Sequence, residues 1–129
     1  MSRKTRILAI DDDPNDLAII VELCRGSGYV VQSAHDGEQG WQYLISDHRP
    51  DLIITDVEMP NLNGEELVAR IHSDMKFQNI PIILLSSKSL KPLKELSGKA
   101  KVVPVIKPVN ETMMREVIKS VLLDTESNQ

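Results

Sequence analysis

The sequence is poor in cysteine, in long apolar runs and in excess basic charge, and each shortage excludes a class of protein. Its one cysteine, Cys24, cannot form an internal disulfide and fits a reducing compartment. No apolar run approaches the ~20 residues that a membrane-spanning helix needs. The apolar run near the N-terminus, residues 7–10, is too short for a secretory signal. We therefore expect a cytoplasmic protein that does not enter a membrane.

The charge balance argues against direct nucleic-acid binding. Fifteen Lys and Arg residues face 19 Asp and Glu residues, which gives a net charge of −4 and no general basic field. The 129 residues suffice for one domain, which we place at residues 1–123, followed by a polar tail or the start of a linker at residues 124–129. The sequence contains no separate output module, so we expect its effect to pass through a protein partner or a further segment.

Short apolar runs alternate with longer segments of helical period, which is typical of an α/β fold around a parallel sheet. Five runs are predicted to be strands: Arg6–Asp11, Tyr29–Ala34, Leu52–Asp56, Ile82–Ser86 and Val102–Ile106. The first, third and fourth are almost continuously apolar, as strands buried on both faces are, and should be central. Right-handed crossovers then give an open, doubly wound sheet that binds ligands beyond the carboxyl ends of its strands.

Four segments carry apolar residues at helical spacing and are predicted to be helices. Their apolar stripes are Leu17, Ile20, Val21 and Cys24; Trp41, Leu44 and Ile45; Gly64, Leu67, Val68 and Ile71; and Met114, Val117, Ile118 and Val121. A further short helix is expected within residues 87–101, with Pro92 near its first turn and Gly98 just past its end.

Polar residues stand at the carboxyl ends of four predicted strands. Asp11 and Asp12 follow the first strand, Asp56 ends the third, Ser86 ends the fourth and Lys107 follows the fifth. Two carboxylates ~4 Å apart repel by about 4 kcal/mol at an effective dielectric constant of 20, so their crevice needs a cation or bound protons. Because these residues offer oxygen ligands and neither sulfur nor imidazole, the sequence favours Mg²⁺ over zinc or copper.

Carboxylates, a hard metal ion, a hydroxyl and a lysine are the groups that phosphoryl transfer uses. We predict that Asp56 is the nucleophile, because it ends the most buried strand and precedes a loop, residues 57–60, whose carbonyls can complete a metal shell. An aspartate after a strand often only caps a turn. That simpler role would have to hold separately at four strand ends, so it is disfavoured here.

These residues resemble the receiver domain of two-component response regulators over nearly the whole chain. Residues 7–14, ILAIDDDP, look like the family's acidic start, and residues 51–64, DLIITDVEMPNLNG, look like its phosphorylation segment. Asp12 and Asp56 are 44 positions apart, Asp56 and Ser86 are 30 apart, and Ser86 and Lys107 are 21 apart. These spacings are close to those usual in the family. The resemblance implies a flavodoxin-like fold with strand order 2-1-3-4-5.

By resemblance, the acids would form a Mg²⁺ site. Asp12, Asp56 and the backbone carbonyl of Glu58 would hold the ion, and Asp11 would act mainly through a metal-bound water. The chain would serve as a switch controlled by phosphorylation rather than as a dedicated enzyme.

The resemblance also implies how the phosphoryl group is handled. Asp56 would accept it from a sensor histidine kinase or a histidine phosphotransfer protein. Ser86 and Lys107 would each contact a phosphoryl oxygen. The peptide bond before Pro108 would be cis and would aim the lysine into the site.

One departure from the family concerns the route of the signal. The fifth strand commonly carries an aromatic residue three positions before the lysine, and this chain has Pro104 there. Because proline cannot donate a ladder hydrogen bond, Pro104 suits this strand only at a sheet edge, where the implied strand order puts it.

Two other classes remain as alternatives. A phosphohydrolase of the haloacid-dehalogenase class also forms an aspartyl phosphate, and Asp11 and Asp13 have the spacing of its acid pair. That assignment leaves Asp56 as a secondary ligand, and the chain has no substrate cap. A flavodoxin-like flavin carrier needs backbone donors after the first strand, where three aspartates would repel its phosphate. Asp13 is better explained as the acid that starts a helix before Pro14.

Overall fold

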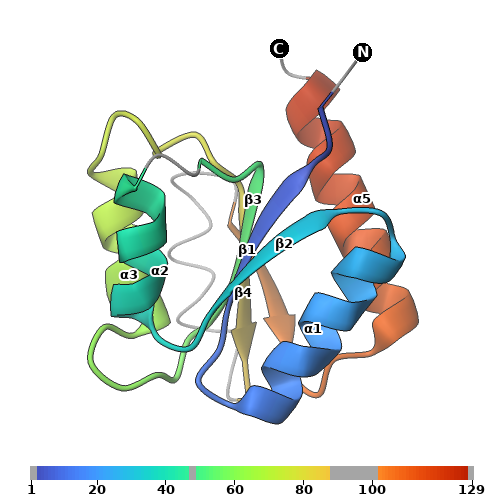
Figure 1. Ribbon diagram of the computed structural model, residues 1–129, viewed down its shortest axis with the longest axis horizontal. Coiled ribbons are helices and arrows are strands. Elements are labelled where there is room, and N and C mark those ends of the chain that lie inside the picture. Colours follow the sequence, from blue (N-terminus) through green and yellow to red (C-terminus); the bar gives the residue numbers. More distant parts are fainter. Residues whose placement is uncertain (1–2, 47–48, 88–101, 128–129) are drawn as a thin grey trace.

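The computed structural model describes residues 3–46, 49–87 and 102–127, which form a parallel sheet between two layers of helices (Figure 1). The strands are β1 (Arg6–Ile10), β2 (Val30–Ala34), β3 (Leu52–Asp56), β4 (Ile82–Ser86) and β5 (Val102–Ile106), and the helices are α1 (Pro14–Gly26), α2 (Gly37–Ile45), α3 (Gly64–His72) and α5 (Glu111–Ser127). The strand order is β2-β1-β3-β4-β5, and all neighbours pair in parallel. The predicted doubly wound α/β fold is confirmed.

The order of the strands follows from their apolar character. The three most apolar runs, β1, β3 and β4, occupy the centre, and all residues of β3 and β4 are buried. β5 is an edge strand, and its Pro104 pairs with Leu84 of β4. An edge position tolerates the missing backbone donor of proline, as the sequence predicts. The short helix predicted within residues 87–101 lies outside the described residues.

Alternate residues of each strand supply the core on opposite faces of the sheet. In β1, Leu8 and Ile10 belong to the core that includes residues of α2 and α3, whereas Ile7 and Ala9 belong to the core that includes residues of α1 and α5. Figure 1 shows these two pairs of helices on opposite faces of the sheet. Each fully buried aliphatic side chain contributes roughly 1.5–3 kcal/mol, so the central strands hold their carboxyl ends in fixed positions.

The helices α1 and α3 start at well-formed caps near the carboxyl ends of strands. The Asp13 side chain accepts a hydrogen bond from the N–H of Asn15 at 2.8 Å, and Pro14 is the first residue of α1. At α3, Asn63 and Glu66 bond reciprocally in a capping box. These caps fix where each helix begins relative to the strand before it.

The helix predictions differ from the structure at two places. Ile45, predicted to lie in the core, is 53% exposed. The buried face of α2 is instead formed by Gly37, Gly40 and Leu44. The two glycines have no side chain, which lets this helix lie close to its neighbours. α5 continues to Ser127, into the segment predicted as a polar tail. None of the helices in the described ranges combines the length with the apolar character that crossing a bilayer demands.

Candidate functional site

The first two acids of the site follow directly after β1. Asp11 is fully buried, and its backbone N–H continues the pairing with β2 by donating to the carbonyl of Ala34 at 3.1 Å. Its carboxylate accepts from the N–H of Asp13 at 3.0 Å. Asp12 is exposed, and Asp13 caps α1 as predicted. The turn after β1 therefore presents the buried carboxylate of Asp11 and the exposed carboxylate of Asp12 beside the cap of α1.

The third acid, Asp56, is the last residue of β3 and is 3% exposed. Its Oδ1 accepts from the N–H of Val57 at 3.0 Å. The N–H of Gly64 donates to the carbonyl of Val57 at 2.9 Å, so α3 begins close to the strand end. A Cβ atom at Gly64 would overlap the carbonyl oxygen of Asp56, which is why this close approach requires glycine.

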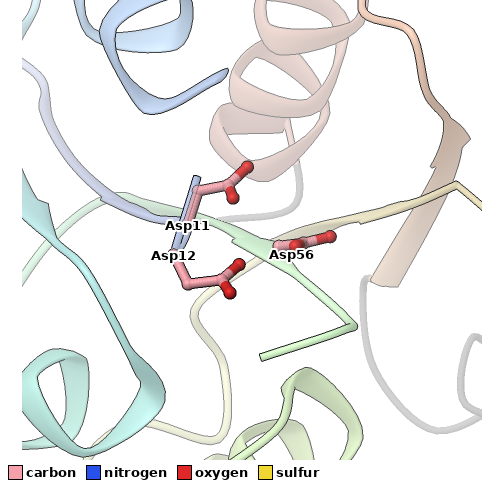
Figure 2. Close-up of side chains that lie close together, drawn as sticks. All are labelled: Asp11, Asp12 and Asp56. Carbon is pink, nitrogen blue, oxygen red and sulfur yellow. The ribbon is translucent and has the colours of Figure 1, made fainter. Parts of the chain in front are cut away.

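The three carboxylates converge from two neighbouring strand ends, and Figure 2 shows them extending toward the same side. One oxygen from each of Asp11, Asp12 and Asp56 lies within 4.8 Å of the other two. Around an octahedral Mg²⁺ ion, opposite oxygens are about 4.2 Å apart and adjacent oxygens about 3.0 Å apart, because each Mg²⁺–O bond is about 2.1 Å long. Small shifts of these side chains would therefore fit the group to Mg²⁺.

Lys107, just past the end of β5, extends into the acid cluster. Its Nζ donates to Oδ2 of Asp11 at 3.0 Å and to Oδ2 of Asp16 at 2.9 Å, and it lies 3.4 Å from Oδ1 of Asp56. The peptide bond to Pro108 is cis, as the resemblance implied. Asp16 was not among the residues predicted for this site. Its position in the first turn of α1, a helix that starts at the same end of the sheet, could have indicated that it lies near the site.

Ser86 and Glu58 meet beside this cluster. The Ser86 hydroxyl, which is buried at the end of β4, donates to Oε1 of Glu58 at 2.9 Å. We expected Glu58 to act through its backbone carbonyl and did not predict this contact of its side chain.

Burial and charge shift the pKa values of the site. Burial and the charge of Asp11, opposed by the charge of Lys107, together raise the pKa of Asp56 to about 7. Burial also raises the pKa of Asp11. Burial would lower the pKa of Lys107, but its hydrogen bonds to Asp16 and Asp11 outweigh burial and raise it. One lysine therefore does not compensate the acids fully, which suits a site that takes up a cation.

Comparison with known proteins agrees with this geometry. Residues 7–119 match the family model of the response regulator receiver domain. Hybrid signal transduction histidine kinase D of Dictyostelium discoideum is 40% identical over 86 residues, which cover 67% of this chain and 5% of that protein. Chemotaxis protein CheY1 of Helicobacter pylori is 29% identical over 127 residues, covering 91% of this chain and 96% of that protein.

The length of the matched relatives varies widely. The gliding motility regulatory protein of Myxococcus xanthus is 37% identical over 86 residues, and the match covers 67% of this chain but 11% of that protein. The chain thus spans a small part of several relatives. Among solved structures, a CheY-like receiver domain protein from Methanospirillum hungatei has a TM-score of 0.87 at 25% identity and covers 98% of this chain and 100% of its own.

Proposed function

This chain belongs to the response regulator receiver family, and from that premise we propose that it accepts a phosphoryl group on Asp56 in a Mg²⁺-dependent reaction. The observation that carries the proposal is the place of Asp56, a buried carboxylate at the end of the central strand β3, between the carboxylates of the β1 end and the Lys107 ammonium. In this role a carboxylate oxygen bonds to phosphorus as the bond from phosphorus to the donor's imidazole nitrogen breaks. The nitrogen keeps the electron pair and takes a proton from water.

The other residues of the site have supporting roles in this proposal. Asp11, Asp12, Asp56 and the backbone carbonyl of Glu58 would hold Mg²⁺, which supplies positive charge next to the phosphoryl oxygens. Lys107 would balance part of the remaining negative charge, since its Nζ already lies 3.4 Å from Asp56 Oδ1. The Ser86 hydroxyl would donate to a phosphoryl oxygen and draw the end of β4 toward Asp56.

The proposed partners follow from membership of the family. A sensor histidine kinase or a histidine phosphotransfer protein would supply the phosphoryl group, and the changed surface would be recognised by a protein effector. The buried, unpaired thiol of Cys24 is compatible with a reducing cytoplasm as the place of action. Nothing in the described site favours a haloacid-dehalogenase phosphohydrolase, because Asp13 is engaged as the cap of α1.

Phosphorylation by a small phosphodonor tests the proposal. With acetyl phosphate and Mg²⁺, intact mass should show one added phosphoryl group, and Asp56→Asn should abolish it. Asp51→Asn is the matched control, because Asp51 lies just before β3, at its other end, and pairs with Arg3 at 2.6 Å. Equal labelling of the Asp56→Asn variant would refute Asp56 as acceptor, and repeated turnover of small phosphate esters would favour a phosphohydrolase.

A further inference from the structure

The contact between Ser86 and Glu58 lies where the proposed phosphoryl group would arrive. Asp56 pairs with Leu85 across β3 and β4, so Ser86 is the next residue along β4 and Glu58 lies two residues past Asp56. The Ser86 Oγ to Glu58 Oε1 distance is 2.9 Å. The carbonyl of Ser86 accepts from the N–H of Lys107 at 2.8 Å, which ties this backbone to the end of β5. The side chain of Ser86 is therefore the part that can most easily change its partner.

The direction of this hydrogen bond follows from the chemistry of its two groups. An ionised carboxylate has no proton to give, so the Ser86 hydroxyl is the donor, and a hydroxyl has one proton. The oxygens of a phosphoryl group on Asp56 are likewise acceptors. Glu58 and the phosphoryl group therefore compete for a single proton.

We infer that Glu58 is a positioning residue that holds the Ser86 hydroxyl until a phosphoryl group on Asp56 takes over its proton. This inference rests on the proposed phosphorylation of Asp56. The burial of the two residues favours such an exchange: Ser86 is 2% exposed and needs a protein partner, whereas Glu58 is partly exposed and can turn its carboxylate to water. The hydrogen bond to Glu58 therefore favours the state before phosphorylation and sets how readily the Ser86 hydroxyl turns toward Asp56.

Removal of the acceptor should make the switch easier to operate. At saturating Mg²⁺, Glu58→Ala should bind the phosphoryl mimic beryllofluoride about tenfold or more tightly than the wild type, the effect of one hydrogen bond to a charged group. Part of any gain comes from the lost negative charge, which repels the anion whether or not Ser86 is present. Glu65→Gln, in the exposed first turn of α3, is the control for a general change in charge and should leave the affinity unchanged.

A double-mutant cycle with Ser86→Ala separates the hydrogen bond from the charge. In the Ser86→Ala background, Glu58→Ala should improve beryllofluoride affinity clearly less than it does in the wild type, because no hydroxyl remains to be released. Equal improvement in both backgrounds would overturn the inference while leaving phosphorylation of Asp56 intact. Absence of beryllofluoride binding and of phosphorylation in the wild type would overturn the proposed function itself.

A second measurement does not depend on phosphorylation. Without any phosphoryl mimic, the NMR resonances of Ser86 in the Glu58→Ala variant should be shifted from their wild-type positions toward those of the wild-type beryllofluoride complex. Resonances of Ser86 that do not move in the variant would mean that Glu58 does not hold this side chain.

Discussion

Replacement of Asp56 by asparagine is expected to stabilise the protein in the absence of metal ions. Asparagine has nearly the same shape as aspartate and keeps a carbonyl oxygen for the N–H of Val57, which donates to Oδ1 of Asp56 at 3.0 Å. It carries no charge, so the cost of burying an ionised carboxylate disappears. The residue that the proposed function depends on most is thus expected to weaken the metal-free fold.

The size of the effect can be worked out from the surroundings of Asp56. Oxygens of Asp11 and Asp56 lie within 4.8 Å, and Lys107 Nζ lies 3.4 Å from Asp56 Oδ1. At an effective dielectric constant of 20, these contacts give about 3.5 kcal/mol of repulsion and about 5 kcal/mol of attraction, so they roughly offset each other. Burial then decides the sign and raises the pKa from 3.8 to about 7. That difference in pKa corresponds to a loss of folding free energy of about 4 kcal/mol at pH 8. Relaxation of the site and entry of water should reduce this loss to about 2 kcal/mol.

Urea unfolding of both proteins between pH 4 and pH 8, with a chelator present, tests this prediction. Because the folded wild type keeps a proton on Asp56 that the unfolded chain has lost, wild-type stability falls as pH rises from about 4 to about 7. The advantage of Asp56→Asn should be near zero at pH 4, grow through this window and level off above it. Asp124→Asn, exposed on α5, should show no such growth. Equal stability of the variant and wild type at pH 8, or an advantage that shrinks as pH rises, would refute the reasoning.

Three further substitutions test the packing and charge of the site. Gly64→Ala should cost about 1–3 kcal/mol in urea unfolding, because its Cβ would overlap the backbone of Asp56. Gly26→Ala, with open space around its Cβ, should stay within about 0.5 kcal/mol of the wild type, and equal losses would contradict the packing argument. Asp12→Ala should lower Mg²⁺ affinity about tenfold or more by calorimetric titration, and an unchanged affinity would exclude Asp12 as a ligand. Asp16→Asn should lower stability by about 1 kcal/mol or less, because the carboxylate that pairs with the site lysine at 2.9 Å is partly exposed; a gain in stability would show that its repulsion of the other acids dominates.

The fold could be predicted where the burial of a strand or helix face produces a regular pattern of apolar residues in the sequence. β3 and β4 are buried on both faces, and their almost continuous apolar runs, each closed by a polar residue, predicted their boundaries to the residue. The exposure of Ile45 could not be predicted, because helical spacing marks the middle of a buried stripe better than its edge. What covers that edge depends on the neighbouring elements, and the two buried glycines of α2 contribute no apolar signal.

The site divides in the same way. Asp11, Asp56 and Lys107 could be placed together from sequence because parallel strands carry their carboxyl ends to one edge, whatever the side chains do. The contacts of Asp16 and Glu58 depend on how far side chains reach between elements that are 91 and 28 positions apart from their partners in the chain. Residue spacing does not predict side-chain contacts between such distant elements, so these two contacts were found only in the structure.

Mg²⁺ should reverse the order of stability that the first prediction gives for the metal-free proteins. Only the folded chain brings oxygens of Asp11, Asp12 and Asp56 within 4.8 Å, so a bound ion stabilises the folded state and favours the ionised form of Asp56. At a free Mg²⁺ concentration 100 times the dissociation constant, the wild type should gain about 2.7 kcal/mol and its loss of stability between pH 4 and 7 should flatten. Asp56→Asn lacks one charged ligand and should gain less, so that at pH 8 the wild type becomes at least as stable as the variant. Urea unfolding with Mg²⁺, against Na⁺ at matched ionic strength, measures both gains. A gain of equal size in the two proteins would place the ion away from Asp56 and would remove the metal from the proposed reaction.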